Sequence, residues 1–289
     1  MPELPEVEAL CRFLDERLAG QLVDSVGVAS VSALKTFEPA VTCLEGSRLG
    51  GVSRRGKLVV VRAVEPEELF VVLHLARGGW VAWRQRLPDR PAGPGRGPLA
   101  LRVRLAGGSG FEVSEQGREK RLAVWVARSL GSLDVVANLG VDPLDPDLSQ
   151  QRLGELLRSS SHHLKGALTD QRLLAGIGNA YSDEILHAAR LSPFKPAARL
   201  SPVELDRLHQ AVVGVLSEAV AGAAGLPASG LKAHKRFGLR VHGRAGQACP
   251  ACGDVVRQVS FATSSLEYCP TCQTGGRVLA DRRLSRLVK

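Results

Sequence analysis

The chain begins Met1-Pro2-Glu3-Leu4-Pro5-Glu6-Val7-Glu8, and the interpretation of the later segments depends on this stretch. Pro5 suits the first turn of a helix, where its missing N–H would have no partner in any case. Apolar side chains then recur at spacings of three and four residues, and Gly20 is placed to end the run. This pattern predicts an amphipathic helix over residues 5–19.

The residues in front of this helix also suit covalent chemistry. Removal of Met1, which a small second residue favours, would leave Pro2 as a terminal secondary amine. A free α-amine has a pKa of about 8, so part of it is neutral and nucleophilic near pH 7. Such an amine attacks aldehyde-level carbons to give an iminium ion, and the Glu3 carboxyl beside it could move protons. Considered alone, the stretch fits a plain helix cap better, and the rest of the chain must decide.

Composition limits the class of protein. The 289 residues are enough for two or three domains with real cores. No apolar run approaches the ~20 residues that span a bilayer, and no basic leader precedes the first helix. We therefore expect a cytoplasmic protein with no membrane partner. The net charge of +9 predicts an anionic partner, nucleic acid first, without distinguishing DNA from RNA or an acidic protein.

From about residue 21 to residue 135 the pattern changes to short β-rich runs separated by turns rich in Gly, Pro and Arg. No helical pattern intervenes, so a β-sandwich or partly open barrel is expected. The basic turn Arg54-Arg55-Gly56-Lys57 precedes a strongly apolar run, and it is either a solvated turn or a phosphate contact. The clearest runs are residues 58–62, 69–74, 80–83, 99–105, 111–113 and 122–127.

The second half of the chain has a helical pattern. Two prolines and a shift in composition mark residues 139–146 as a linker at a domain boundary. Ser149 could cap a helix that runs to Arg158. Ser201-Pro202-Val203-Glu204 combines a capping box with Pro at the first helical position, and it predicts a helix to about Ala224.

Between these helices lies the turn Gly176-Ile177-Gly178-Asn179. Its glycines allow a tight backbone turn, and Asn179 opens the next helix, where backbone N–H groups form a ready phosphate site. A plain corner between two helices is the alternative. The nearby Lys165 and the basic charge of the chain favour phosphate.

A basic segment follows over residues 231–246. It contains no acidic residue, so it fits a nucleic-acid contact better than an ordinary solvated face. The residues predicted to make this contact are Lys232, Lys235 and Arg236.

Four cysteines form two C-x₂-C pairs separated by sixteen residues. This spacing is typical of a tetrahedral zinc ribbon, and the four thiolates leave no open position, so the zinc ion is structural. The predicted ligands are Cys249, Cys252, Cys269 and Cys272. The remaining cysteines, Cys11 and Cys43, are expected to be buried free thiols.

Together these features resemble the bacterial formamidopyrimidine-DNA glycosylase / endonuclease VIII family of base-excision repair enzymes, over nearly the full chain. The resemblance implies an α+β multidomain protein: an N-terminal β-sandwich with an N-terminal helix, a helix–two-turn–helix domain and a C-terminal zinc-ribbon hairpin. The implied domains are residues 1–138, 147–235 and 240–289, the last with a basic tail. The motifs that carry the resemblance are Pro2-Glu3-Leu4-Pro5-Glu6, Arg54-Arg55-Gly56-Lys57, Gly176-Ile177-Gly178-Asn179 and the two cysteine pairs.

The resemblance also implies an activity. Such enzymes flip a damaged nucleotide out of double-stranded DNA, excise an oxidised or ring-opened base and cleave the strand at the abasic site. Pro2 would attack the deoxyribose C1′ and form a Schiff base, Glu3 would protonate the sugar ring oxygen, and Glu6 would support the site. Lys57, with Pro2 and Glu3, completes the implied catalytic set. The implied protein is a monomer with one structural zinc ion, in the bacterial cytoplasm and at the nucleoid when bound to DNA.

The DNA contacts follow from the same resemblance. Lys57 and Asn179 would hold the phosphates beside the lesion, with Lys165 nearby. Arg77 stands where the family inserts a Met into the gap left by the flipped base. The family's Arg-Phe wedge falls at Lys120-Arg121-Leu122, which makes Arg121 a contact and replaces the aromatic residue by Leu.

Two further departures concern how the lesion is read. Ser264 stands where the zinc hairpin usually carries an Arg, and we expect Arg257 or the basic tail over residues 275–289 to compensate. The segment 225–240 is short for a loop that closes over oxidised purines. The short segment, together with Arg77 and Leu122 at the wedge positions, predicts more activity on abasic sites, ring-opened purines or oxidised pyrimidines than on 8-oxoguanine opposite cytosine.

Two other classes of protein stay open. One is a catalytically weak or inactive damaged-DNA-binding protein of the same fold, although binding alone does not need a terminal proline. The other is a zinc-ribbon transcription or RNA-binding factor, which the charge permits but which leaves Pro2 and Glu3 unexplained.

Overall fold

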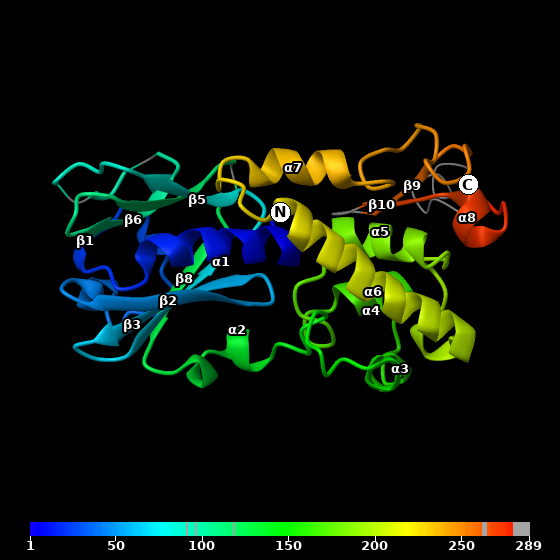
Figure 1. Cartoon of the computed structure of the whole chain (residues 1–289), viewed down its shortest axis with the longest axis horizontal. Coiled ribbons are helices and arrows are strands. Elements are labelled where there is room, and N and C mark those ends of the chain that lie inside the picture. The colour runs from blue at the N-terminus through cyan, green and yellow to red at the C-terminus, as the bar shows by residue number, and fades with distance from the viewer. Residues whose placement is uncertain (91, 96, 118, 262–264, 280–289) are drawn as a thin grey trace, which may run out of the picture. The chain divides into compact units, whose positions relative to one another are not determined.

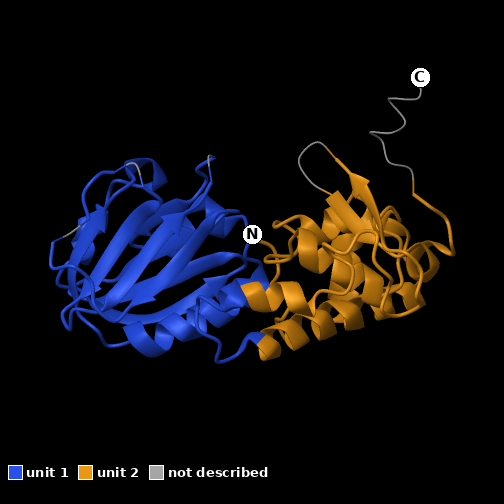
Figure 2. Cartoon of the chain, turned by 90° about the horizontal axis from the view of Figure 1, so that it is seen from above, with its two compact units in different colours: residues 1–138, 223–232 blue, residues 139–222, 233–289 orange. Residues whose placement is uncertain are grey.

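The computed structural model describes residues 1–289 except 91, 96, 118, 262–264 and 280–289. The chain folds into two compact units, shown in blue and orange in Figure 2. The first unit comprises residues 1–138 and 223–232, and the second comprises residues 139–222 and 233–289. The predicted division into three domains stays a prediction. Among the described residues, no helix is both long and apolar enough to cross a bilayer.

The first unit is a β-sandwich with an N-terminal helix, α1 (Leu4–Leu18), as expected (Figure 1). Its two four-stranded sheets have the strand orders β1-β6-β7-β5 and β2-β3-β4-β8, with antiparallel pairing throughout both. The strands are β1 (Val23–Val28), β2 (Arg48–Arg55), β3 (Leu58–Glu65), β4 (Leu69–His74), β5 (Gly79–Arg84), β6 (Leu99–Leu105), β7 (Gly110–Glu115) and β8 (Ala123–Ala127). Short helical turns complete the unit at η1 (Val31–Ala33), η2 (Val41–Leu44), η3 (Leu130–Ser132) and α2 (Asp134–Ala137).

Six of the eight strands coincide with the predicted runs, whereas β1 and β2 were not among them. β2 is an edge strand with only one fully buried residue, Leu49, and its pairing with β3 shifts register before Gly51. A strand that buries little and contains two glycines has no clear alternation of apolar and polar residues. The signal for β2 was therefore weak in the sequence.

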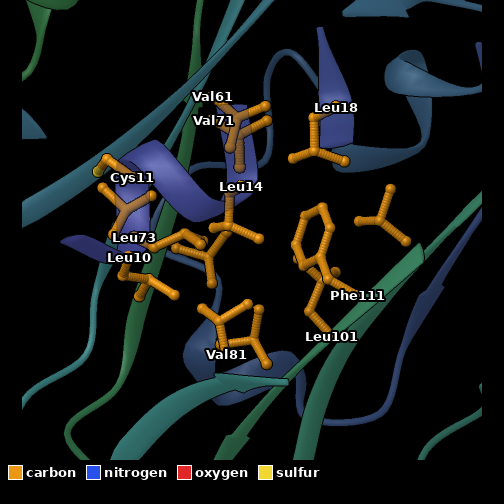
Figure 3. Close-up of a cluster of buried hydrophobic side chains, with 14 of the residues drawn as sticks. Leu10, Cys11, Leu14, Leu18, Val61, Val71, Leu73, Val81, Leu101 and Phe111 are labelled. Carbon is orange, nitrogen blue, oxygen red and sulfur yellow. The ribbon is translucent and has the colours of Figure 1, made fainter. Parts of the chain in front are cut away.

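The core of the first unit joins α1 to side chains from both sheets (Figure 3). Leu10, Leu14 and Leu18 on one stripe of α1 are fully buried in the same cluster as Val71 and Phe111. Packing of this stripe, more than intrinsic helix propensity, therefore stabilises α1.

The two cysteines outside the ribbon differ from each other. Cys11 is buried as expected; its thiol donates to the Ser53 carbonyl at 3.2 Å, and burial raises its pKa. The prediction for Cys43 is wrong, because this residue is exposed. It lies on η2, where Val41 and Leu44 face the core and the residues between them do not.

The second unit combines helices with one hairpin. Its elements are α3 (Gln150–Arg158), α4 (Leu164–Thr169), α5 (Asn179–Ala188), η4 (Ala197–Arg199), α6 (Pro202–Ala223), α7 (Leu231–Gly238), β9 (Arg257–Ser260), β10 (Ser265–Tyr268) and α8 (Pro270–Thr274). The last residue of α6 and the first two of α7 belong to the first unit, which the chain re-enters between these helices. The predicted caps are confirmed: Ser149 Oγ accepts from the Arg152 N–H at 3.2 Å, and Ser201 and Glu204 cap each other's N–H groups at 3.3 and 2.8 Å.

Candidate active site and nucleic-acid interface

Two buried carboxylates, Glu3 and Glu6, lie at the start of α1 close in sequence to Pro2. Pro2, Glu3 and Glu6 are all buried. The Glu3 N–H donates to Glu6 Oε2 at 2.8 Å, so Glu6 satisfies one of the N–H groups that a helix leaves unpaired at its start. Negative charge is favoured at this end of a helix, which makes the cap and the predicted chemistry compatible in one structure.

The hairpin that carries Lys57 is tied to α1. Gly56 and Lys57 form a two-residue loop between β2 and β3, and Gly56 has a φ of +56°, a value that favours glycine. Arg54 Nε donates to Glu8 Oε2 of α1 at 2.9 Å, and the Arg54 side chain is only 8% exposed. Arg54 therefore connects the Lys57 hairpin to the helix that begins two residues after Pro2.

His74 was not among the predicted site residues, although it pairs with Leu58 directly after the hairpin loop. Burial lowers the pKa of His74, and the positive charge of Lys57 lowers it further. The imidazole is therefore neutral at pH 7 and offers both a donor and an acceptor beside Lys57. Its half-buried position at the end of an apolar strand gave no signal in the sequence.

Arg77 is exposed at the turn between β4 and β5. The backbone of this turn is unusual: Ala76 has a φ of +49°, and the Gly79 N–H donates to the Leu75 carbonyl at 2.8 Å. A Cβ on Gly78 would lie 2.1 Å from the Gln116 carbonyl oxygen, so only glycine fits there. The turn thus presents Arg77 from a tightly constrained backbone.

The adjacent residues Arg121 and Leu122 differ in their exposure to solvent. The buried Glu115 carboxylate accepts hydrogen bonds from the N–H groups of Arg121 at 2.8 Å and Leu122 at 3.0 Å, and so fixes the backbone of this loop. Arg121 is exposed and pairs with Glu119 at 2.9 Å. The Leu122 side chain is 3% exposed and belongs to the core, so its predicted place in the wedge is wrong. A side chain that stabilises the core cannot also enter a duplex.

In the second unit, the predicted phosphate residues lie next to each other. The Gln171 side chain holds the glycine turn before α5: its Nε2 donates to the Ile177 carbonyl at 2.8 Å, and its Oε1 accepts from the Gly176 N–H at 2.9 Å. Asn179 is the first residue of α5. Lys165 on α4 donates to the Asn179 carbonyl at 3.0 Å, which brings the lysine to the first turn of that helix.

The first half of the basic segment forms the helix α7. In the first unit Lys232 Nζ lies 4.7 Å from the Trp80 ring centroid, and burial lowers the pKa of this lysine. In the second unit Lys235 Nζ lies 4.7 Å from the Tyr181 ring centroid. Arg236 is exposed. Cation–π contacts leave an ammonium group able to donate to an anion, so the packing of both lysines is compatible with a DNA contact.

The four ribbon cysteines come together as predicted, and their sulfur atoms all lie within 4.8 Å of one another. The Sγ atoms of Cys249 and Cys272 are 3.9 Å apart, and those of Cys252 and Cys269 are 3.4 Å apart. Tetrahedral zinc with Zn–S bonds of about 2.3 Å needs sulfur separations of about 3.8 Å, so the four residues fit a structural zinc ion. The segment between the pairs forms the predicted hairpin, β9 with β10.

His187 on α5 is a further residue of the zinc site that sequence reasoning missed. Its Nε2 lies 3.2 Å from Cys249 Sγ, and burial lowers its pKa. A neutral imidazole that donates Nε2–H to a thiolate orients that ligand and lowers its charge density. The predictions for Ser264 and for the tail from residue 280 onward lie outside the described residues, while Arg257 is exposed on β9.

Three family models match the chain in order. The formamidopyrimidine-DNA glycosylase N-terminal domain matches residues 1–123, and the formamidopyrimidine-DNA glycosylase H2TH domain matches residues 139–229. The zinc finger found in FPG and IleRS matches residues 246–275. The three matches cover the α1 terminus, the glycine turn and the cysteine pairs.

Relatives with known names agree with these matches. A formamidopyrimidine-DNA glycosylase of Symbiobacterium thermophilum is 32% identical over 292 residues, which cover 98% of this chain and 93% of that protein. An uncharacterised formamidopyrimidine-DNA glycosylase-like protein of Mycobacterium tuberculosis is 56% identical over 151 residues, which cover 52% of this chain and 94% of that protein. The structure of Lactococcus lactis Fpg in complex with DNA containing an abasic site aligns with a TM-score of 0.82 and 26% identity, covering 94% of this chain and 99% of that one. The chain belongs to the formamidopyrimidine-DNA glycosylase family.

Proposed function

We propose that the protein is a base-excision repair DNA glycosylase that also cleaves the DNA strand at abasic sites, with the Pro2 nitrogen as nucleophile. The observation that carries the proposal is the placement of Pro2 with two buried carboxylates, Glu3 and Glu6, at the positive end of α1. The Lactococcus lactis relative, solved with abasic-site DNA, supports the substrate class. We infer a monomer acting on chromosomal DNA in the cytoplasm.

The proposed reaction begins with attack of the neutral Pro2 nitrogen on C1′ of the flipped nucleotide. The C1′–N bond to the base breaks as the bond to Pro2 forms, and the base leaves with the electron pair and takes up the proton that the Pro2 nitrogen loses. Glu3 then protonates the sugar ring oxygen as the ring opens, and the nitrogen lone pair forms the iminium ion. Glu6 accepts the Glu3 N–H at 2.8 Å and so fixes the position of the acid.

Strand cleavage follows from the iminium ion. The positive nitrogen acidifies C2′–H, and loss of this proton to a base breaks the C3′–O bond and releases one phosphate. In a second elimination, loss of the C4′ proton to a base breaks the C5′–O bond and releases the other phosphate, and water then hydrolyses the iminium to free Pro2. The Glu3 carboxylate, after it has given up its proton, is the base nearest to the nitrogen in sequence.

The phosphates need cationic partners on each side of the lesion. Lys57 projects from a hairpin that Arg54 fastens to α1. Asn179 offers the N-terminal end of α5, where backbone N–H groups attract anions. Lys232, Lys235 and Arg236 add charge along α7. The net charge of +9 provides the long-range attraction to DNA.

The residues expected to contact the damaged base favour substrates for which the base itself needs little recognition. Arg77, exposed on its constrained turn, can fill the gap of the flipped nucleotide and stack its guanidinium on bases. Arg121 would contact the strand beside it. Half of the segment that would have to cover a flipped purine, residues 225–240, is the helix α7. We therefore infer robust action on abasic sites and a preference for ring-opened purines or oxidised pyrimidines.

Borohydride reduction in the presence of abasic-site DNA tests the nucleophile, because it converts the iminium into a stable covalent adduct. Protein whose N-terminal sequence begins at Pro2 should form the adduct, and Pro2→Gly should reduce it to background. Pro5→Ala, which changes the other proline of the same helix start, should still form it. Glu3→Gln should bind the DNA but cleave it about 10²- to 10⁴-fold more slowly.

Two outcomes would contradict the proposal. Undiminished adduct with Pro2→Gly would move the nucleophile to another amine, such as Lys57. Tight binding of abasic DNA by the unaltered protein without any adduct would make it a damaged-DNA-binding protein instead.

A further inference from the structure

Most of the buried polar side chains in the described part of the second unit lie on α5 or on the zinc ribbon (residues 249–272). Buried polar groups are tolerated only when they are hydrogen-bonded, so such a concentration marks an interface with specific geometry. The buried polar residues of α5 and the ribbon are Ser182, Asp183, Glu184, His187 and Glu267, and Gln273 lies directly after the ribbon.

Asp183 is the centre of this interface and is only 1% exposed. Its Oδ1 accepts from Lys165 Nζ at 2.5 Å. Its Oδ2 accepts from His242 Nδ1 at 2.8 Å and from the backbone N–H of Glu267 at 3.2 Å. One carboxylate therefore joins α4 to the segment before the ribbon and to strand β10.

The charges in this cluster balance without any further ion. His242 Nδ1 also lies 2.8 Å from Glu267 Oε2, so two carboxylates face Lys165 and a protonated His242. Burial acts to lower the pKa of His242, but the hydrogen bond to Asp183 and the negative charge of the Glu267 carboxylate raise the pKa to about 9. Two cations and two anions in a desolvated site stabilise one another, while removal of one member leaves an unpaired charge.

Lys165 has no donor left for a phosphate in this arrangement. An ammonium group has three N–H donors. Its Nζ donates to the Asn179 carbonyl at 3.0 Å, to Ser182 Oγ at 3.0 Å and to Asp183. The side chain is 12% exposed. A direct contact with DNA would break one of these three bonds.

Two other residues of α5, Glu184 and His187, contact the segment before the ribbon and the ribbon itself. Glu184 Oε2 accepts from the Arg240 N–H at 2.8 Å, and Glu184 Oε1 accepts from the N–H groups of Val241 and His242 at 2.9 and 2.8 Å. His187, one turn further along α5, contacts the zinc ligand Cys249. The same helix thus opens at Asn179 and supports the ribbon over its next two turns.

We propose that Asp183 is a positioning residue that links the zinc ribbon to the phosphate-binding turn. Through Lys165 it fixes the first turn of α5, where Asn179 would bind DNA phosphate; through His242 and the Glu267 N–H it docks the ribbon on the same helix. Lys165 then acts by positioning and not as a phosphate ligand. If the docked ribbon strengthens DNA binding in this way, DNA binding strengthens zinc retention by the same factor, because thermodynamic coupling between two sites is reciprocal. This inference rests on the proposed function in DNA binding.

The first test compares the full-length zinc protein with Asp183→Asn, which keeps the shape of the side chain but removes its charge. We expect the affinity for a duplex containing a tetrahydrofuran abasic analogue to fall about tenfold or more, as for a coupled buried ion pair. The same duplex should slow zinc release to a chelator in the unaltered protein and have little effect in Asp183→Asn. Asp147→Asn, an exposed aspartate of the same unit, should behave like the unaltered protein.

The second test separates positioning from direct phosphate contact. Lys165→Met should weaken binding without changing the dependence of log Kd on log salt concentration, whereas loss of a phosphate contact would reduce that slope by about one. The double variant Lys165→Met/Asp183→Asn should bind no more weakly than the weaker single variant, because both act through one ion pair. Circular dichroism and zinc content confirm that each variant is folded and loaded.

The outcomes separate this inference from the proposed function. If the unaltered protein does not bind the duplex, the proposed function fails, while faster zinc release from Asp183→Asn without DNA still supports docking of the ribbon. If Asp183→Asn keeps normal affinity and normal zinc release, the inference is overturned. A salt slope reduced by one in Lys165→Met makes the lysine a phosphate ligand and also overturns it.

Discussion

At the scale of single residues, the start of α1 shows how a structural cap and a reactive group share one site. Glu6 satisfies the Glu3 N–H, and both carboxylates are buried beside Pro2. The helix needs acceptors at this end, and the proposed reaction needs a proton donor there. The geometry that caps the helix therefore also holds the proposed acid in place.

Arg54 provides a prediction at this scale, because the basic turn 54–57 had two interpretations. The Arg54 side chain is 8% exposed and its Nε lies 2.9 Å from Glu8 Oε2. Arg54→Met should lower the free energy of unfolding by about 1.5–3 kcal/mol, since it removes the charged hydrogen bond to Glu8 Oε2, while Arg12 still pairs with Glu8 Oε1 at 2.9 Å. Arg55→Met, at the exposed neighbour, should change it by less than about 0.5 kcal/mol. Urea unfolding of both variants measures this difference.

Measurements of DNA binding by the same two variants can contradict this structural role of Arg54. If Arg54→Met keeps normal stability but loses affinity and salt dependence, then Arg54 contacts phosphate and the ion pair with Glu8 is incidental.

At the scale of elements, α5 and the ribbon behave as one structure. Asp183, Glu184 and His187 each make at least one buried contact with the ribbon or with the segment that leads into it. A zinc ribbon that shares buried charges with a helix cannot lose its metal without disturbing that helix. This differs from the picture of an independent hairpin that only touches DNA.

Removal of zinc should therefore destabilise α5 as well as the hairpin β9–β10. Freshly purified protein should contain one zinc ion per chain, and chelation should weaken binding of abasic-site DNA at least about tenfold, within the usual range of allosteric coupling. Hydrogen exchange should become faster in β9, β10 and α5, while the core strands β3 and β4 of the first unit stay protected. Mass spectrometry of exchanged fragments makes this comparison.

Metal analysis that finds no zinc in fresh protein would contradict the assignment of the four cysteines. Accelerated exchange confined to the ribbon, with α5 unchanged, would instead show that the two elements are independent.

His242 provides a pH prediction for the same elements. It faces Asp183 of α5 and Glu267 of β10, and Lys165 of α4 lies on the other side of Asp183. Burial opposes protonation, but the two carboxylates raise the pKa of His242 from its ordinary value of 6.5 to about 9. The stabilisation from its charge is therefore complete below about pH 6.5 and is lost as the pH rises through about 9.

The measurement compares the free energy of unfolding of the zinc protein and of His242→Gln between pH 6.5 and 9.5. The stability advantage of the unaltered protein should shrink by about 2–3 kcal/mol over this range, since each pKa unit corresponds to about 1.4 kcal/mol. Parallel pH profiles of the two proteins would show that His242 contributes no charge to the cluster.

At the scale of the whole molecule, the proposed activity combines a general attraction to DNA with weak reading of the base. The net charge of +9 attracts any duplex. Arg77 and Arg121 are exposed, whereas Leu122 is part of the core and offers no wedge. An abasic site needs no base pocket, so only the nucleophile, the acid and the phosphate contacts are required.

A panel of duplexes with single lesions, under single-turnover conditions, tests this expectation. Cleavage at an abasic site should be fastest, and ring-opened purines or oxidised pyrimidines should be excised about tenfold or more faster than 8-oxoguanine opposite cytosine, a difference of about 1.4 kcal/mol in barrier. Arg77→Ala should slow base excision more than abasic-site cleavage. If 8-oxoguanine opposite cytosine is the best base substrate, the interpretation of Arg77 and α7 is wrong.

Local patterns determined much of this protein. The three- and four-residue spacing of Val7, Leu10 and Leu14 predicted α1, and the cysteine spacing predicted the ribbon, because both signals lie within a few neighbouring residues. The caps at Ser149 and Ser201 were predictable for the same reason. The sequence also determined the family, since four short motifs occur in the required order.

Only the tertiary structure decided which charged and thiol groups are buried and with which partners. Arg54 pairs with Glu8, 46 residues away, and Asp183 meets Glu267 across 84 residues. Cys43 turned out to be exposed and Leu122 buried. Such pairings depend on how elements distant in sequence pack together, and a charged residue looks the same in a sequence whether water or another charge balances it.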